Sequence, residues 1–301
     1  RKRFLMGGLK VANVGQENDL TYKVNNLGQS PVILEEILSG KHEFSKVLKD
    51  AKKPLIIVGY GALTRPDGEA ILSAASKVAE KFGVVKDGWN GFGILHKAAS
   101  RVGGLELGFV PQKNGKDVAG ILAAVEKGEI EVVYLLGADE IDTEKLSKAF
   151  VIYQGHHGDA GAHVADVVLP GAAYTEKDAT YINLEGRAQR TRIAVFPPGQ
   201  AKEDWLIISE LAKELGETIA AKNLSELRSL MAKESPNTAK IDQIISAKWK
   251  LVDSKTKMLD KPMRNTIENF YMTDPISRAS KTMAACSAEF LDKKSSKEEA
   301  A

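Results

Sequence analysis

The sequence predicts an α/β fold, in which a doubly wound, mainly parallel sheet is followed by a helical or extended C-terminal tail. Runs that are apolar on both faces, such as residues 55–58 and 131–136, alternate with amphipathic helical patterns. Strands of that kind are typical of a parallel sheet covered by helices on both sides. Right-handed crossovers between the strands make such a sheet doubly wound. The pattern changes after Pro197-Pro198-Gly199, so we expect an α/β domain over residues 1–198 and a helical and extended region over residues 199–301.

The first strand and helix of this pattern lie between residues 54 and 83. A buried strand follows Pro54 and ends at the turn 59–61. Asp67 is placed to begin the next helix, and Gly83 is placed to end it. Its apolar residues recur at the spacing of one helical face: Ile71, Ala74, Ala75, Val78 and Phe82.

A second group of elements follows, with a helix between Asp117 and Gly128 and a strand over residues 131–136. A short helical stretch at 143–149 leads to two more strands, at 150–153 and 164–169. In open α/β sheets, ligands bind in the loops at the carboxyl ends of the strands. Here those loops are 59–61, 137–142 and 155–161.

The region after residue 199 contains two predicted helices and the tail. The first helix presents one apolar face and ends at Gly216; the face consists of Trp205, Ile208, Ala212 and Leu215. Asn223 and Glu226 have the spacing of a capping box, and that helix stops before Pro236. From Ala239 the chain is charged and poor in apolar periodicity, which predicts an extended or helical tail, partly disordered in isolation.

Composition excludes several classes of protein. The 301 residues include 42 basic and 40 acidic side chains, and the near-balanced net charge of +2 gives no electrostatic case for binding nucleic acid. No basic block suggests binding to a membrane surface. No apolar run approaches the roughly 20 residues of a membrane-spanning helix. Cys286 is the single cysteine, so no internal disulfide or four-cysteine iron–sulfur cluster is expected, and a reducing compartment is favoured. Because the chain begins at Arg1 without an initiator methionine, we expect it to be processed or to be a portion of a longer protein.

The loop after the strand at 150–153 holds potential metal ligands. Imidazole and carboxylate groups gather there and suit zinc or iron: His156, His157, Asp159, His163 and Asp166. Their spacing matches no standard metal motif, so a hydrogen-bonded structural loop is the competing interpretation. The backbone amides of Gly155, Gly158 and Gly161 could instead hold a phosphate. The glycines do not form the dinucleotide-binding fingerprint, and no clear helix pattern follows them.

Charged residues further along carry two interpretations each. Glu176, Asp178 and Glu185 could act as a general acid and base, or could form surface ion pairs with Lys177 and Arg187. A basic stripe could bind a phosphate ester or form an interfacial edge; it consists of Arg187, Arg190 and Arg192. The chain has no nucleophile elbow, Walker A or zinc-protease motif, so hydrolase, nucleotidase and metalloprotease activities have no support.

A run of specific positions resembles the molybdopterin oxidoreductase family, whose enzymes hold a bis-pterin cofactor beside this region. The run consists of residues 165–170, Glu176-Lys177, Thr180, Asn183, Glu185-Gly186-Arg187 and Gln189. The fuller string at 154–189 is more similar to the 75 kDa iron–sulfur subunits of mitochondrial respiratory complex I, the NADH:ubiquinone oxidoreductases. Pieces along the rest of the chain agree: residues 20–22, 39–42, 136–139, 203–205, 270–274 and 276–280.

The resemblance implies a core subunit of complex I, which transfers electrons from NADH to ubiquinone and translocates protons. It implies other matrix-arm subunits as partners, a location on the matrix side of the mitochondrial inner membrane, and no transmembrane segment of the chain's own. In the full-length family, [2Fe–2S] and [4Fe–4S] clusters are held by an N-terminal half that this sequence does not contain.

Departures from the family's enzymes predict that this portion is a scaffold without catalysis. No iron–sulfur motif can be placed here, and Ala179 stands where the enzymes commonly have glycine, which would crowd a pterin. We therefore expect no catalytic, cofactor-binding or metal-binding residues in this chain. The alternatives are a fragment of an active molybdopterin-dependent oxidoreductase and a free nucleotide-binding α/β domain.

Overall fold

The structure is a computed structural model that describes residues 1–18 and 20–292. Internal contacts divide the chain into two compact units. Unit 1 comprises residues 1–99 and 245–266, and unit 2 comprises residues 100–244 and the chain from residue 267 onward. The division of the chain at residue 198 stays a prediction, because compact units and homologous domains are different ways to divide a chain.

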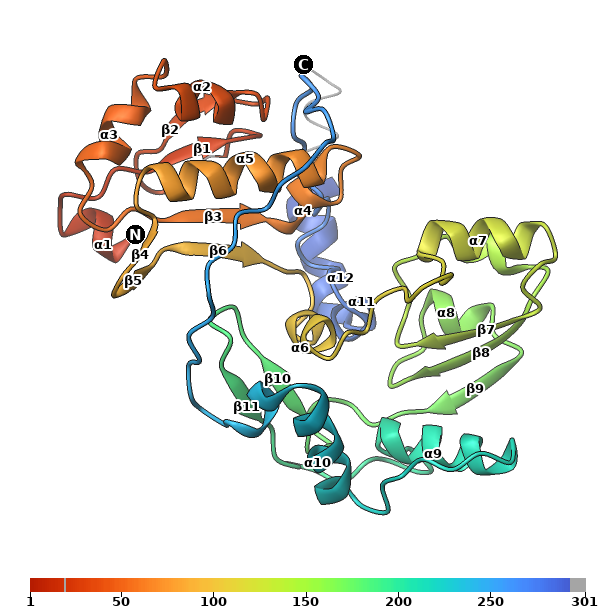
Figure 1. The fold of residues 1–301 in the computed structure, drawn as a ribbon. Coiled ribbons are helices and arrows are strands. Elements are labelled where there is room, and N and C mark those ends of the chain that lie inside the picture. Colours follow the sequence, from red (N-terminus) through yellow and green to blue (C-terminus); the bar gives the residue numbers. More distant parts are fainter. Residues whose placement is uncertain (19, 293–301) are drawn as a thin grey trace. The chain divides into compact units, whose positions relative to one another are not determined.

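Unit 1 contains small sheets and the helices beside them (Figure 1). Its elements are α1 (Lys2–Leu5), β1 (Ala12–Val14), β2 (Asn25–Gly28), α2 (Ile33–Ser39), α3 (Phe44–Asp50), β3 (Ile56–Gly59), α4 (Tyr60–Leu63), α5 (Gly68–Lys81), β4 (Val85–Lys86), β5 (Trp89–Asn90) and β6 (Phe92–Leu95). Strands β1 and β2 pair in parallel, as do β3 and β6, whereas β4 and β5 form an antiparallel hairpin. The predicted strand at 55–58 corresponds to β3.

Helix α5 provides most of the core of unit 1 and lies along β3 in Figure 1. The predicted apolar face is buried except at Phe82, which is half-buried, and Ile71 and Val78 are each 2% exposed. Gly83 follows the helix at φ +62°, a backbone conformation that glycine adopts without steric cost. Asp67 occupies the cap position, but its side chain does not cap the helix.

The segment 245–266 is extended and lies against α5, as the sequence predicts for part of the tail. Its backbone amides donate hydrogen bonds from Leu259 to Asp67 Oδ2 at 2.9 Å and from Val252 to Ser76 Oγ at 3.3 Å. The indole ring of Trp249 meets the ring of Phe92 edge-on, with centroids 5.2 Å apart. The tail thus forms part of unit 1, although it lies about 200 residues from α5 in sequence.

Unit 2 is built around one three-stranded sheet and a hairpin. Its elements are α6 (Arg101–Glu106), α7 (Val118–Glu126), β7 (Val132–Leu136), η1 (Thr143–Leu146), β8 (Phe150–Gly155), α8 (Ala160–His163), β9 (Val167–Pro170), β10 (Thr180–Ile182), β11 (Ala188–Arg190), α9 (Asp204–Glu214), α10 (Leu224–Glu234), η2 (Pro236–Ala239), α11 (Pro275–Arg278), α12 (Lys281–Ser287) and η3 (Ala288–Asp292).

Strands β7, β8 and β9 pair in parallel, and one face of their sheet packs against α7 and η1. The buried core on this face consists of Val125, Val133, Leu135, Leu146, Val151 and Tyr153. On the opposite face Val132 is 58% exposed and Phe150 is 47% exposed. The expected α/β class and its parallel pairing are therefore confirmed. In the described residues the strands are short and divide among sheets of two or three.

The helices after residue 199 lie close to their predicted positions. In α10 the Asn223 side chain accepts the amide of Glu226 at 2.9 Å, while Glu226 Oε2 accepts the amide of Lys222. Helix α9 ends at Glu214, so Leu215 leaves the expected apolar face and is 72% exposed. Ile207 is the buried residue of that helix instead. Among the described residues, none of the helices is long and apolar enough to cross a membrane.

Candidate functional site

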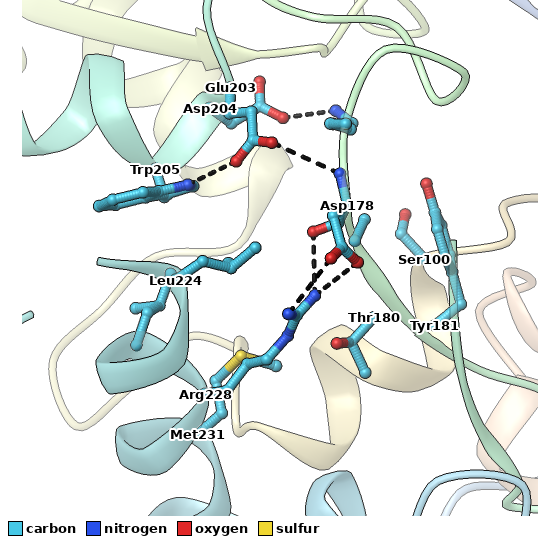
Figure 2. A pocket seen from close by; sticks show the side chains of 13 residues that line it. Ser100, Asp178, Thr180, Tyr181, Glu203, Asp204, Trp205, Leu224, Arg228 and Met231 are labelled. Carbon is cyan, nitrogen blue, oxygen red and sulfur yellow. Dashed lines mark hydrogen bonds and ion pairs between the residues drawn. The ribbon is translucent and has the colours of Figure 1, made fainter. Parts of the chain in front are cut away.

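A pocket of about 260 Å³ opens in unit 2 beside the predicted polar loop (Figure 2). It lies among the stretch 177–181, the start of α9, and α10. Its lining combines paired charges with an apolar wall from Trp205, Leu224, Leu227 and Met231. Ligand pockets for small organic molecules usually measure about 300–1,000 Å³, so this one is small.

Lys177 belongs to a chain of polar contacts that reaches the end of β8. Its ammonium group contacts Asp204 Oδ2 at 2.5 Å, and Gln154 Nε2 donates to Asp204 Oδ1 at 2.9 Å. Gln154 is fully buried and accepts a hydrogen bond from the hydroxyl of Tyr134. Both carboxylate oxygens of Asp204 are therefore engaged, which fixes the start of α9 against the sheet.

Arg228 of α10 holds the loop from the other side of the pocket (Figure 2). Its guanidinium contacts Asp178 Oδ1 at 2.7 Å and also donates to the Asp178 carbonyl at 3.2 Å. Glu203 accepts the indole N–H of Trp205 at 2.7 Å. Arg228 thus links α10 to a loop 50 residues earlier, which favours a structural role for this pair.

The ion pairs predicted from the sequence form only in part. Glu185 lies 3.6 Å from Arg187 as expected. Lys177 and Asp178 have the more distant partners described above, and Glu176 accepts the amide of Ala173 at 2.9 Å. The ion pairs predicted between sequence neighbours were wrong for Lys177 and Asp178, because the loop folds back onto α9 and α10.

The basic stripe does not form one cluster in the pocket. Arg187 donates to the carbonyl of Asp242 at 2.5 Å, whereas Arg190 and Arg192 are exposed at and just after β11. The geometry of these described residues therefore gives no common binding point for a phosphate ester.

The histidine loop is held by local hydrogen bonds. His156 and His157 approach each other at 2.7 Å between their Nδ1 atoms, and His163 Nδ1 lies 2.8 Å from the carbonyl of Asp159. Asp166 accepts the amide of Val151 at 2.7 Å and so joins β8 to β9. In the part of the chain that the structure describes, no group of three His, Cys, Asp or Glu residues is arranged to hold a metal ion.

Two glycines of this loop pack against Tyr153. A Cβ atom on Gly161 would lie 2.7 Å from the Tyr153 ring and 2.8 Å from Asp139 Oδ1. A Cβ atom on Gly155 would also collide with the Tyr153 ring, whereas Gly158 faces open space. The Gly161 amide donates to Asp139 at 2.8 Å. Close packing therefore explains why positions 155 and 161 are glycine, without a bound phosphate. The short helix α8, which contains Gly161, was not predicted from the sequence.

Two side chains in this region have altered proton affinity. Burial, and then the hydrogen bond to Asp139, raise the pKa of the Tyr153 hydroxyl above its ordinary value. Desolvation, and then the proximity of His157 and Lys177, lower the pKa of His156. Both shifts favour the neutral form of the side chain, which for Tyr153 is the form that donates a hydrogen bond to Asp139.

The residues present do not fit a bis-pterin cofactor, which the fold family implies. Its phosphates require cationic or amide donors, but Lys177 and Arg228, the cations of the pocket, are engaged by carboxylates. The Ala179 amide already donates to Thr191 Oγ1 at 2.9 Å.

Comparison with known proteins places the chain in a family. The model of the family "Molybdopterin oxidoreductase" matches residues 1–214, and the chain belongs to that family. Residues 234–286 match the family that describes the C-terminal part of the G subunit of NADH-ubiquinone oxidoreductase. Both resemblances expected from the sequence are therefore confirmed.

The chain is also similar to curated relatives that are named as the G subunit of NADH-quinone oxidoreductase. It is 48% identical over 284 residues to that of Rickettsia bellii (strain RML369-C), covering 94% of this chain and 40% of the relative. It is 46% identical over 285 residues to that of Rickettsia felis (strain ATCC VR-1525 / URRWXCal2), covering 95% of this chain and 41% of the relative. The chain thus spans about two fifths of the length of these relatives.

One solved structure with some likeness is acetylene hydratase from Pelobacter acetylenicus. It aligns with a TM-score of 0.28 and 21% identity, over 33% of this chain and 15% of that chain. An overlap of this size supports no argument about the site.

Sequence reasoning missed Gln154, Asp204 and Arg228, which organise the pocket. Gln154 offered one signal, because a polar residue directly after an apolar strand needs a partner if it is buried. Asp204 and Arg228 lie on separate helices. Asp204 belongs to the stretch 203–205 that matches the family, but the match gave it no role in a site, and Arg228 matches no motif. Their roles depend on how α9 and α10 pack.

Proposed function

We propose that this chain is part of a subunit of respiratory complex I, the assembly that passes electrons from NADH to a quinone. Similarity over 94% of the chain to a relative named as the G subunit of NADH-quinone oxidoreductase is the observation that carries the proposal. The match of residues 234–286 to a family named for the same subunit agrees with it. The iron–sulfur clusters, the quinone chemistry and the coupled proton translocation would be supplied by the remainder of that subunit and by its partners.

Within that assembly we propose a scaffold role without catalysis. Lys177, Asp178, Asp204 and Arg228 pair with one another across the pocket, which supports a site that stabilises the fold. Electron transfer requires redox centres at fixed separations, so a rigid support is needed even where it performs no chemistry. The predicted division into an α/β domain at 1–198 and a helical and extended region at 199–301 belongs to this proposal.

The partners we propose are other subunits of the peripheral arm. Val132, Leu136 and Phe150 are exposed on the face of the β7–β9 sheet opposite α7, although parallel sheets are normally covered on both faces. The contact of Gln154 with Asp204 of α9 covers only one end of this face. Docking of a neighbouring subunit would cover this face. The resemblance to mitochondrial subunits supports a location on the matrix side of the inner membrane, and fractionation of mitochondria with protease protection tests that location.

The test replaces Lys177 by Met in the full-length subunit, with Lys202→Met as the matched control. Lys177 has a 20% exposed side chain, whereas Lys202 pairs with Glu210 at the surface and has a 47% exposed side chain. We expect Lys177→Met to lower the amount of assembled complex while NADH turnover per assembled complex stays the same. Unchanged assembly with lower turnover would contradict the scaffold role.

The family match over residues 1–214 favours one rival, an active molybdopterin-dependent oxidoreductase. That rival requires stoichiometric molybdenum or tungsten in the full-length protein, which the scaffold role does not. A free nucleotide-binding domain is the second rival. Calorimetric binding of NADH or ATP by the isolated subunit would support it.

A further inference from the structure

The loops after β7 and β8 carry several carboxylates at the carboxyl edge of the sheet. Asp139 and Glu140 follow β7, and Asp159 follows β8. This is the edge at which open α/β sheets bind their ligands. An acidic edge would repel phosphate groups and attract a cation.

Arg278, at the end of α11, supplies that cation from the C-terminal segment. Its guanidinium lies 3.0 Å from Glu140 Oε1 and also donates to Asp159. The Arg278 side chain is 25% exposed and that of Asp159 is 21% exposed, so the contact is partly shielded from water. One arginine thus joins the loops after two neighbouring strands.

The approach of Arg278 is set by the structure before it. Asp274 begins α11 with a capping box, in which its carboxylate accepts the amides of Ile276 and Ser277 at 2.9 and 3.0 Å. Asn269 also donates to Ser287 Oγ at 2.7 Å, which joins α12 to the residues that precede α11. The residues around Arg278 are therefore ordered by their own contacts.

Asp139 of the first loop already joins both loops to the core on their inner side. Asp139 accepts both the Tyr153 hydroxyl at 3.0 Å and the Gly161 amide at 2.8 Å. Arg278 adds the outer contact to the same two loops. Loops that bind a ligand usually keep freedom to close over it, whereas these loops are held from both sides.

We propose that residues 274–287 are an internal partner that docks onto the loops 137–142 and 155–161 through the contacts of Arg278 with Glu140 and Asp159. The docked segment takes the place of a ligand at the carboxyl edge of the β7–β9 sheet and keeps that edge closed. The partner that this surface fits is a guanidinium-bearing segment, here supplied by the same chain. The inference depends on contacts within unit 2 and is independent of the proposed respiratory role.

Hydrogen exchange of the full-length subunit, read by mass spectrometry, tests this docking. We expect Arg278→Ala to accelerate exchange about tenfold or more in residues 274–287 and in both loops together, because a charge-assisted contact is lost. Arg278→Lys keeps the charge without the planar fork and should accelerate the same peptides less. Arg264→Ala removes an exposed arginine of the tail and should change none of them.

Glu140→Gln is the second probe, in case Arg278→Ala does not fold. It removes one of the two carboxylates and should accelerate exchange in the tail segment, with a normal far-ultraviolet circular dichroism spectrum. Faster exchange confined to the tail, with both loops unchanged, would overturn the proposal. So would unchanged exchange in Arg278→Lys and Glu140→Gln together.

Discussion

Asp67 gives the sharpest prediction for stability, because it joins the start of α5 to the segment 245–266. Its carboxylate is fully buried and accepts Arg65 Nε at 2.8 Å, Arg65 Nη2 at 3.1 Å and the Leu259 amide at 2.9 Å. Asp67→Asn keeps the shape of the side chain but removes its charge. The guanidinium of Arg65, whose side chain is only 17% exposed, then loses its carboxylate partner. Losing charge-assisted hydrogen bonds at a buried site should lower the free energy of unfolding by about 3 kcal/mol at pH 7.

The pH dependence of this effect has a definite sign. Hydrogen bonding to Arg65 holds the pKa of Asp67 below its ordinary value of 3.8. The stabilisation is therefore fully present above the unfolded pKa and is lost as pH falls through the lower folded pKa. The gap between wild type and Asp67→Asn should be constant from about pH 5 to 8 and should narrow below about pH 4.

Urea unfolding monitored by tryptophan fluorescence in a Trp205→Phe background measures this gap, because Trp89 and Trp249 both lie in unit 1. Asp253→Asn is the matched control, since Asp253 pairs with Lys77 at 3.5 Å with an 88% exposed side chain. That control should cost less than about 1 kcal/mol. Two results would show that the buried ion pair does not stabilise unit 1. One is equal stability of wild type and Asp67→Asn at pH 7, and the other is a difference in their free energies of unfolding that does not narrow in acid.

Three further predictions concern unit 2. Gly161→Ala should lower the midpoint of thermal unfolding by an amount equivalent to about 1–3 kcal/mol, because its Cβ would meet the Tyr153 ring at 2.7 Å, whereas Gly158→Ala should be neutral. Asn223→Ala should cost about 1 kcal/mol in urea unfolding and accelerate amide exchange at the start of α10, and Asn223→Asp should retain the cap. Phe150→Ser should change subunit stability by less than about 0.5 kcal/mol but reduce recovery of the assembled complex on native gels, since Phe150 is 47% exposed. Equal recovery of the complex would count against docking on this face.

The fold was predictable where local patterns determine it. The spacing of Ile71 and Val78 predicted α5, and the glycine after that helix marked its end. What the sequence did not reveal depends on contacts between distant segments. Asp67 has the position of a helix cap, yet its carboxylate accepts hydrogen bonds from Arg65 and from the amide of Leu259, 192 residues away.

The candidate site shows the same limit. The stretch 154–189 identified the region and the family, because its residues match a motif. Its chemistry was misjudged wherever a partner lies on another element, as with Arg228 for Asp178 and Asp204 for Lys177. The spacing of Gly161 is compatible with binding a phosphate through its backbone amide. The packing of Tyr153 against this glycine, which explains it in the structure, cannot be inferred from spacing.

The central claim is that this portion of the molecule supports a respiratory complex without a pterin cofactor. The most direct test is elemental analysis of the purified full-length subunit within its assembled, NADH-oxidising complex. We expect iron from the clusters of the assembly and no stoichiometric molybdenum or tungsten. One molybdenum or tungsten atom per subunit would contradict a scaffold role without a pterin cofactor.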